Sequence, residues 1–212
     1  MKTILAFGDS LTFGANAETQ GRHAWEDRWP TVLEQGLGGA ARVIPEGLGG
    51  RTTVFDDFSA AADRNGARVL PTLLDTHKPL DLVIIFLGTN DLKVYLNGTA
   101  FGAAMGVKRL VEIVRTHPYG NHGGVPKIVI VAPPLTVATE HQDLHPMFAP
   151  RADEAKLFDF YYARIAHELG AGYFNAAGVA VATPVDGVHL DAQNTRAIGE
   201  GLVPVVKSQL GL

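Results

Sequence analysis

A serine near the start of the chain and a histidine near its end are the residues best suited to chemistry. Ser10 stands in Gly8-Asp9-Ser10-Leu11, where an apolar run gives way to a turn, so its hydroxyl is predicted to be exposed there. A serine attacks a carbonyl carbon only when a base removes its proton. His189 is the best candidate base, because Asp186 three residues earlier can hold one ring nitrogen while the other points away. Each motif alone also fits an ordinary turn.

Two further segments offer hydrogen-bond donors for the oxyanion that forms on an attacked carbonyl. Gly50 lies in a glycine-rich turn, where its backbone N–H can approach a ligand without obstruction by a side chain. Asn90 follows Gly88-Thr89 at the end of a long apolar run and supplies an amide side chain. Glycine and asparagine are also common turn residues, so neither motif indicates a catalytic site by itself. The four motifs together do indicate one, because all of them fall at predicted strand ends or at the entrance of the last helix.

Short apolar runs alternate with helical spacing, which is typical of a repeated β-α chain. Leu82–Leu87 is apolar at every position, as expected of a central parallel strand that is covered on both faces. The pattern predicts an α/β fold: a three-layer α/β/α sandwich around a mainly parallel five-stranded sheet, formed by residues 1–212 as a single domain. The expected strands are Ile4–Phe7, Val43–Ile44, Leu82–Leu87, Ile128–Ala132 and Tyr173–Phe174.

The remaining segments indicate where a ligand would bind. The last helix is predicted to begin near Asp191, a good N-cap residue, two positions after His189. Thr12–Arg28 and Pro133–Pro150 are long for simple connections, and such segments are often functional. We expect both near the carboxyl ends of the strands, where open α/β sheets bind their ligands.

Composition excludes several classes of protein. With 46% apolar and 19% charged residues, the chain has an ordinary globular composition. Its net charge of -4 comes from interspersed acids and bases, so no nucleic-acid partner is expected. No run approaches the roughly 20 apolar residues of a membrane span. The start of the chain reads as a strand rather than a signal peptide, which predicts a cytoplasmic protein with no membrane partner.

A metal site is not expected. The chain has no cysteine, so thiolate ligands are excluded. His141 and His145 have a spacing that suits a metal on a helix, but their segment is loop-like and no third ligand is arranged nearby. We interpret these two, together with His117 and His122, as solvated loop histidines, and we expect no cofactor.

The four blocks Gly8-Asp9-Ser10-Leu11, the Gly50 turn, Gly88-Thr89-Asn90-Asp91 and Asp186-Gly187-Val188-His189 resemble, in order, those of the SGNH/GDSL hydrolases. The resemblance implies a flavodoxin-like sheet, Ser10 as nucleophile with Asp186 and His189 as its partners, and an oxyanion hole formed by Ser10 N–H, Gly50 N–H and the Asn90 side chain. It also suggests a homo-oligomer.

The longer strings FGDSLTFG, EGLGGRTT, LDLVIIFLGTND and DGVHL are similar to the bacterial arylesterase/acyltransferase branch of that family. Members of this branch hydrolyse small aryl or alkyl esters and can pass the acyl group to an alcohol instead of water. We therefore expect a small-molecule ester as substrate, with water or an alcohol as acceptor.

Neighbours of the motif residues are candidates for the lining of the substrate pocket. These candidates are Leu11, Lys93, Phe148 and Val188, although Phe148 with Met147 fits core or subunit packing better. A carbohydrate O-deacetylase or a thioesterase with the same triad remains an alternative. A non-catalytic, phosphate-binding module on a flavodoxin-like sheet is a remote one, because the chain lacks the P-loop motif.

Overall fold

The computed structural model describes residues 1–96, 98–121 and 123–212, so His122 lies outside the described residues. Within this part of the chain, five parallel strands form one sheet in the order β2-β1-β3-β4-β5. The strands are β1 (Lys2–Gly8), β2 (Ala41–Gly47), β3 (Leu82–Phe86), β4 (Lys127–Ala132) and β5 (Gly172–Asn175). The predicted parallel five-stranded sheet is confirmed.

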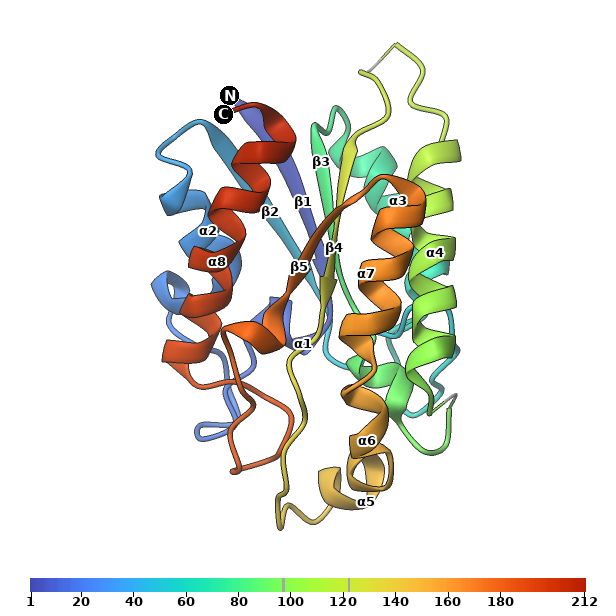
Figure 1. Cartoon of the computed structure of the whole chain (residues 1–212), viewed down its shortest axis with the longest axis vertical. Coiled ribbons are helices and arrows are strands. Elements are labelled where there is room, and N and C mark those ends of the chain that lie inside the picture. Colours follow the sequence, from blue (N-terminus) through green and yellow to red (C-terminus); the bar gives the residue numbers. More distant parts are fainter. Residues whose placement is uncertain (97, 122) are drawn as a thin grey trace.

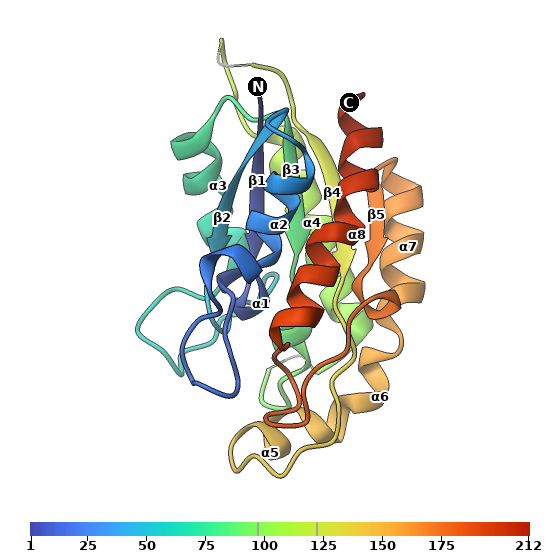
Figure 2. The same ribbon diagram turned by 90° about the vertical axis from the view of Figure 1, so that its left-hand side faces the viewer.

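Helices cover both faces of the sheet, which gives the three layers that the sequence predicts (Figure 1). One face carries α2 (Trp29–Gly36) and α8 (Ala192–Leu210), and the other carries α3 (Gly66–His77), α4 (Ala100–Thr116) and α7 (Phe158–Leu169). Figure 2 shows the same layers from the side. The short helices α1 (Ser10–Phe13), α5 (Leu144–Phe148) and α6 (Ala152–Ala155) lie toward the ends at which the strand arrows point.

The two faces of the sheet pack into separate hydrophobic clusters, because successive strand residues point to opposite sides. In β1, Ile4 and Ala6 are buried against the α2/α8 layer, while Leu5 and Phe7 are buried against the α3/α4/α7 layer. Burial on both faces explains why the central strands contain almost no polar residue. This double packing fixes the carboxyl ends of β1 and β3, from which the candidate site is built.

All five strands differ from the expected bounds at one end or both, and the differences at β2 and β3 have a clear physical reason. β2 runs over seven residues and includes Pro45, which an edge strand tolerates because one side of it carries no ladder. β3 ends at Phe86, one residue early, and the carbonyl of Leu87 accepts a hydrogen bond from the Tyr162 hydroxyl at 2.9 Å instead of continuing the ladder.

The segments around the strand ends are more structured than expected. Thr12–Arg28 includes the last two residues of α1 and a 3₁₀ turn at Trp25–Asp27, and Pro133–Pro150 includes α5. Helix α8 begins directly after Asp191, whose carboxylate caps the helix by accepting a hydrogen bond from Asn194 N–H at 2.7 Å.

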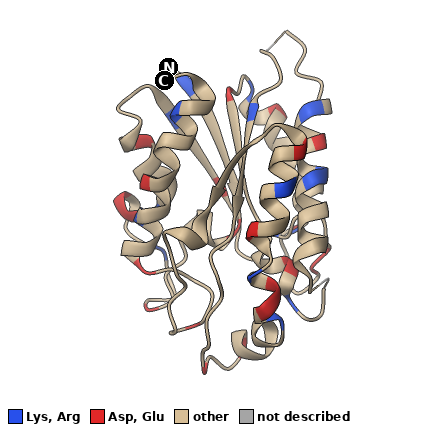
Figure 3. Cartoon of the chain, viewed as in Figure 1, with Lys and Arg blue, Asp and Glu red and all other residues tan. Residues whose placement is uncertain are grey.

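Charged residues are mixed on the visible surface. Figure 3 shows Lys and Arg interspersed with Asp and Glu along α4 and α7, without a stripe of one sign. Among the described residues, no helix combines the length and the hydropathy that crossing a bilayer requires.

Candidate active site

Ser10 is the first residue of α1 and follows β1 after a single intervening residue. That residue, Asp9, caps the short helix: its Oδ1 accepts a hydrogen bond from Leu11 N–H at 2.9 Å. Gly14 closes the helix in a left-handed conformation, with its N–H donated to the Ser10 carbonyl. Ser10 is 9% exposed and its side chain opens into a pocket, so the hydroxyl is accessible although the backbone is fixed.

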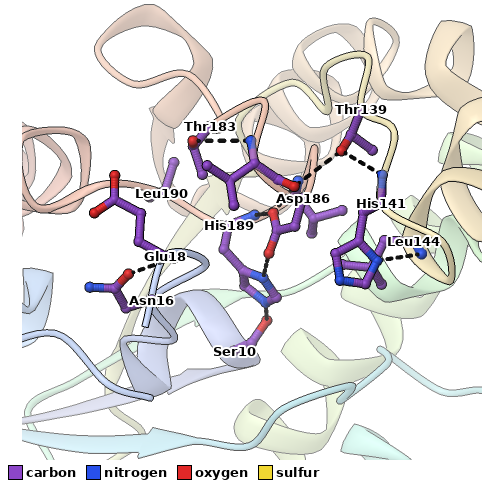
Figure 4. A network of polar contacts seen from close by, with 12 residues as sticks. Ser10, Asn16, Glu18, Thr139, His141, Leu144, Thr183, Asp186, His189 and Leu190 are labelled. Carbon is purple, nitrogen blue, oxygen red and sulfur yellow. Dashed lines mark hydrogen bonds and ion pairs between the residues drawn. The ribbon is translucent and has the colours of Figure 1, made fainter. Parts of the chain in front are cut away.

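His189 connects the serine to an aspartate. Its Nε2 lies 2.9 Å from Ser10 Oγ, and its Nδ1 lies 2.5 Å from Asp186 Oδ2. Figure 4 shows the three side chains in one line, with the imidazole in the middle. With the Nδ1 proton donated to the carboxylate, Nε2 is left as the acceptor for the serine hydroxyl proton. The structure thus brings together the three residues that the sequence predicts as partners.

A closed turn sets the geometry between Asp186 and His189. Thr183 N–H donates to the His189 carbonyl at 2.8 Å, and Gly187 N–H donates to the Thr183 carbonyl at 2.9 Å. Gly187 has a φ of +80°, which glycine adopts without strain. A Cβ at this position would lie 2.6 Å from the carbonyl oxygen of Val137. The absence of a side chain at Gly187 therefore also allows the 133–143 loop to pack closely against this turn.

Hydrogen bonds keep Asp186 ionised. Burial alone would raise its pKa, but the His189 side chain and the backbone N–H groups of His189 and Val188 donate to the carboxylate and hold the pKa below its usual range. An ionised Asp186 can stabilise the imidazolium that forms when His189 accepts a proton.

Gly50 and Asn90 line the same pocket as Ser10 and His189. Among the described residues, the backbone N–H groups of Ser10 and Gly50 donate to no other group, so both are free to meet a ligand. Asn90 Nδ2 lies 3.2 Å from Asp9 Oδ2 and 3.2 Å from the Arg51 carbonyl. An oxyanion would therefore share one of the Asn90 amide protons with a protein acceptor.

Charged residues lie beneath this part of the pocket. Arg51 donates to the carbonyls of Gly8 and Glu46 at the ends of β1 and β2, and burial lowers its pKa to about 10. Burial also raises the pKa of Asp9 to about 6, in spite of the hydrogen bond from Leu11 N–H. These contacts were not predicted from the sequence, in which Asp9 and Arg51 belong to quoted motifs but were given no role of their own.

The pocket at Ser10 has a volume of about 590 Å³. The candidates Lys93, Phe148 and Val188 line it, and Phe148 also packs in the hydrophobic core, as the sequence favoured. Leu11 does not line the pocket: it is 3% exposed and packs in the hydrophobic cluster under α2 and α8, which corrects its assignment to the pocket. Lining residues that no sequence motif indicates include Gln20, Ser59, Arg64, Tyr95 and Leu144.

A smaller cavity of about 290 Å³ lies on another side of the imidazole. It is lined by Asn16, His141, Val185 and Asp186, and it shares His189 with the larger pocket. Figure 4 shows His141 beside Asp186, with its ring nitrogen facing the backbone at Leu144. His189 is thus accessible from two cavities.

The interpretation of the other histidines as solvated is wrong in part. His117 packs its ring against Tyr119 and reaches Asp75, with only 6% of its side chain exposed. His23, which stands in no motif of the sequence, is buried and donates from Nε2 to the Leu190 carbonyl at 3.0 Å. Across the described residues, no group of three His, Cys, Asp or Glu side chains is arranged to hold a metal ion.

Comparisons with known proteins identify the family of this sequence and fold. Residues 6–196 match the model of the GDSL-like lipase/acylhydrolase family. A carbohydrate acetylesterase family member from Sinorhizobium meliloti is 52% identical, with a TM-score of 0.96 and 100% of both chains covered. A protein from Agrobacterium tumefaciens, provisionally called an arylesterase, is 50% identical, with a TM-score of 0.93 over 98% of this chain and 99% of that one.

An aryl esterase from M. smegmatis is 38% identical, with a TM-score of 0.94 over 99% of this chain and 100% of that chain. A search of curated proteins finds no match. Because the family model covers most of the sequence and the fold agrees over the whole length, the chain belongs to the GDSL-like lipase/acylhydrolase family and is a hydrolase.

Proposed function

We propose that this hydrolase is a serine esterase that cleaves small carboxylic esters through an acyl-enzyme on Ser10. The observation that carries the proposal is the continuous line of hydrogen bonds from Ser10 Oγ through His189 to Asp186. A serine placed in this way is activated by its base at the moment of attack. The proposed nucleophile, base and orienting carboxylate are thus Ser10, His189 and Asp186.

In the first half of the reaction, Ser10 Oγ bonds to the ester carbonyl carbon while His189 Nε2 takes the hydroxyl proton. His189 then returns that proton to the leaving alcohol as the C–O bond breaks. In the second half, a water molecule loses a proton to Nε2 and attacks the acyl carbon, and Ser10 leaves with its proton restored. The products are a carboxylic acid and an alcohol.

The oxyanion of each tetrahedral intermediate would accept from Ser10 N–H, Gly50 N–H and Asn90 Nδ2. Support comes from the two backbone donors, which have no other acceptor among the described residues. Removing one donor of this kind costs roughly 3 kcal/mol of transition-state stabilisation.

The size of the pocket and the similar proteins together indicate the class of substrate. A volume of about 590 Å³ suits a small ester. We infer acetyl or other short acyl groups on aryl or alkyl alcohols, because similar chains are an aryl esterase and a carbohydrate acetylesterase family member. The same observation makes carbohydrate O-deacetylation the second candidate. No comparison favours a thioesterase or a non-catalytic binding module.

Acyl transfer to an alcohol is an extension of the same chemistry. The smaller cavity reaches His189 from beside Asp186, which offers a route for an acceptor while the acyl group occupies the larger pocket. An alcohol that enters there would take the place of water in the second half-reaction.

Assembly, compartment and domain organisation remain predictions. Self-association is supported by exposed rings on α4 and α7, where Phe101 and Phe160 both contact Tyr161. We propose a homo-oligomer of single 1–212 units on that ground. A cytoplasmic location rests on the sequence alone.

The proposal is tested by kcat/KM on 4-nitrophenyl acetate, an acetylated sugar and acetyl-CoA, with the partition of product measured in added alcohol. We expect turnover of the two oxygen esters by the wild type and by Ser208→Ala, whose serine is exposed near the end of α8. Ser10→Ala is expected to lose turnover by several orders of magnitude. Equal rates in the two serine variants would contradict the assignment of the nucleophile.

A further inference from the structure

Two cationic side chains line the pocket beside the proposed oxyanion donors. Lys93 follows Asn90 by three residues, and its N–H donates to the Asn90 carbonyl at 3.3 Å. Arg64 lies against Gly50 so closely that a Cβ there would be 2.4 Å from Arg64 Nε. Both side chains belong to the pocket of Ser10. A charge on either one therefore acts within the substrate site.

One buried carboxylate holds both cations. Asp57 Oδ2 lies 2.7 Å from Lys93 Nζ and 2.9 Å from Arg64 NH1, and the Asp57 side chain is 1% exposed. Its other oxygen accepts from the N–H and the hydroxyl of Ser59, at 3.0 and 2.6 Å. Burial would raise the pKa of Asp57, but the hydrogen bonds from Lys93 and Ser59 outweigh burial and lower it far below its usual range. The group of three charges thus carries one surplus positive charge.

The lining of the pocket does not neutralise this surplus. Among the described residues, the lining contains Lys93, Arg64 and His189 as basic residues and no acidic residue. Asp9 and Arg51 lie beneath the pocket and offset each other. Asp57 accepts four hydrogen bonds, which uses its lone pairs.

Donors remain on the two cations. Lys93 Nζ makes one hydrogen bond in the described structure, to Asp57, and has two further protons. Arg64 donates only from NH1, so its Nε and NH2 groups have no acceptor among the described residues. Because hydrogen bonds between a cation and an anion are stronger than neutral ones, these remaining donors can bind an anionic group of a ligand in the pocket.

We propose that Lys93 and Arg64 form a subsite for a carboxylate, or a similar oxyanion, carried by the ester substrate. This inference rests on the proposed esterase function and specifies its substrate class. The enzyme then discriminates between an anionic ester and its neutral isostere at the step where the substrate binds. The anionic group can belong to the alcohol or to the acyl part, and the test separates these two sources.

The test compares two matched pairs of esters. For the alcohol side, 4-acetoxybenzoate is compared with methyl 4-acetoxybenzoate, and for the acyl side, mono-4-nitrophenyl adipate with its methyl ester. After each kcat/KM is divided by the rate of hydroxide hydrolysis, we expect the anionic member of one pair to be favoured about tenfold, which equals about 1.4 kcal/mol. The preference should decrease as NaCl screens the charges.

Variants identify the side chains responsible. Lys93→Met should bring the anionic-to-neutral ratio close to one, and Arg64→Gln, at a side chain that is 21% exposed, should lower it as well. Lys108→Met is the matched control, because Lys108 pairs with Glu168 on the outer surface and should keep the wild-type ratio.

A wild-type ratio near one in both pairs, or an undiminished ratio in folded Lys93→Met and Arg64→Gln, would overturn the subsite. The esterase proposal is judged separately: it requires that the wild type hydrolyses the neutral esters and that Ser10→Ala does not. A failed subsite with active hydrolysis of the neutral esters therefore leaves the proposed function standing.

Discussion

Asp9 and Asn90 are joined by a hydrogen bond of 3.2 Å between Asp9 Oδ2 and Asn90 Nδ2, although 81 positions separate them in the chain. The other oxygen of Asp9 caps the turn that carries Ser10. One buried carboxylate thus fixes both the turn of the proposed nucleophile and the amide of a proposed oxyanion donor. Asp9 is accordingly a positioning residue, which acts through Ser10 and Asn90.

Asp9→Asn should lower kcat about tenfold and leave KM close to the wild-type value, because an amide cannot hold both Leu11 N–H and Asn90 in the same orientation. Asn90→Ala should lower kcat on the order of 10²-fold. Steady-state kinetics of a double-mutant cycle measure the coupling. If the effects of Asp9→Asn and Asn90→Ala on kcat multiply, Asp9 does not act through Asn90.

Asp186→Asn should lower kcat by about 10³-fold or more, because an amide facing Nδ1 no longer fixes the tautomer in which Nε2 accepts the Ser10 proton. KM should change little, since Asp186 does not line the larger pocket. Asp191→Asn is the control: it keeps the N-cap of α8 and should keep the activity. A fully active Asp186→Asn would remove Asp186 from the mechanism.

Gly187→Ala should destabilise the fold and impair catalysis together. The new Cβ would lie 2.6 Å from the Val137 carbonyl at a φ of +80°, so the loop that positions Asp186 must shift. Gly38→Ala is matched in φ, at +60°, but has no atom within 4 Å of its Cβ. We expect Gly187→Ala to lower the free energy of unfolding by about 3 kcal/mol and Gly38→Ala to lower it by about 1 kcal/mol, as measured by urea denaturation. Only Gly187→Ala should also lower kcat.

Asp91 should make stability depend on pH near neutrality. Burial raises its pKa from 3.8 to about 7 in the folded chain, in spite of hydrogen bonds from Thr53. A raised folded pKa stabilises the fold below the unfolded pKa, and that contribution is lost as the pH rises through the folded pKa. Relative to Asp91→Asn, the wild type should lose about 4 kcal/mol between pH 4 and pH 7 and nothing further above it.

The difference between the two unfolding free energies, measured by denaturant titration at several pH values, checks this prediction. An Asp91→Asn variant that follows the wild-type stability curve in parallel would show that Asp91 is ionised throughout. The exposed pair of Asp153 and Lys156 offers a control, since Asp153→Asn should leave the curve unchanged over the same range.

The sheet was predictable because burial on both faces leaves a simple mark in the sequence. Leu82–Leu87 could hardly be anything but a central strand, and its neighbours followed from the β-α alternation. The predicted strand ends were less accurate where tertiary contacts determine them. At Leu87, for example, the carbonyl accepts a hydrogen bond from the Tyr162 hydroxyl. The sequence predicts too short an edge strand β2, because Pro45 argues against a strand in any sequence pattern.

The candidate triad was predictable because Ser10 and His189 stand in short motifs at element ends. The cations of the pocket were not: Arg64 and Asp57 lie in an irregular polar segment, and only the folded chain brings them to Lys93. Leu11 illustrates the opposite error. Adjacency to Ser10 suggested the pocket, but successive residues of α1 point in different directions, and Leu11 faces the core.

The proposed mechanism depends most on an activated serine at position 10. The most direct test of that serine is treatment of the purified protein with a fluorophosphonate, followed by intact mass measurement and peptide mapping. We predict one adduct per wild-type chain, located on Ser10, slower labelling of His189→Ala, and no adduct on Ser10→Ala. An adduct that persists in Ser10→Ala, or a folded wild type that stays unlabelled, would contradict the assignment.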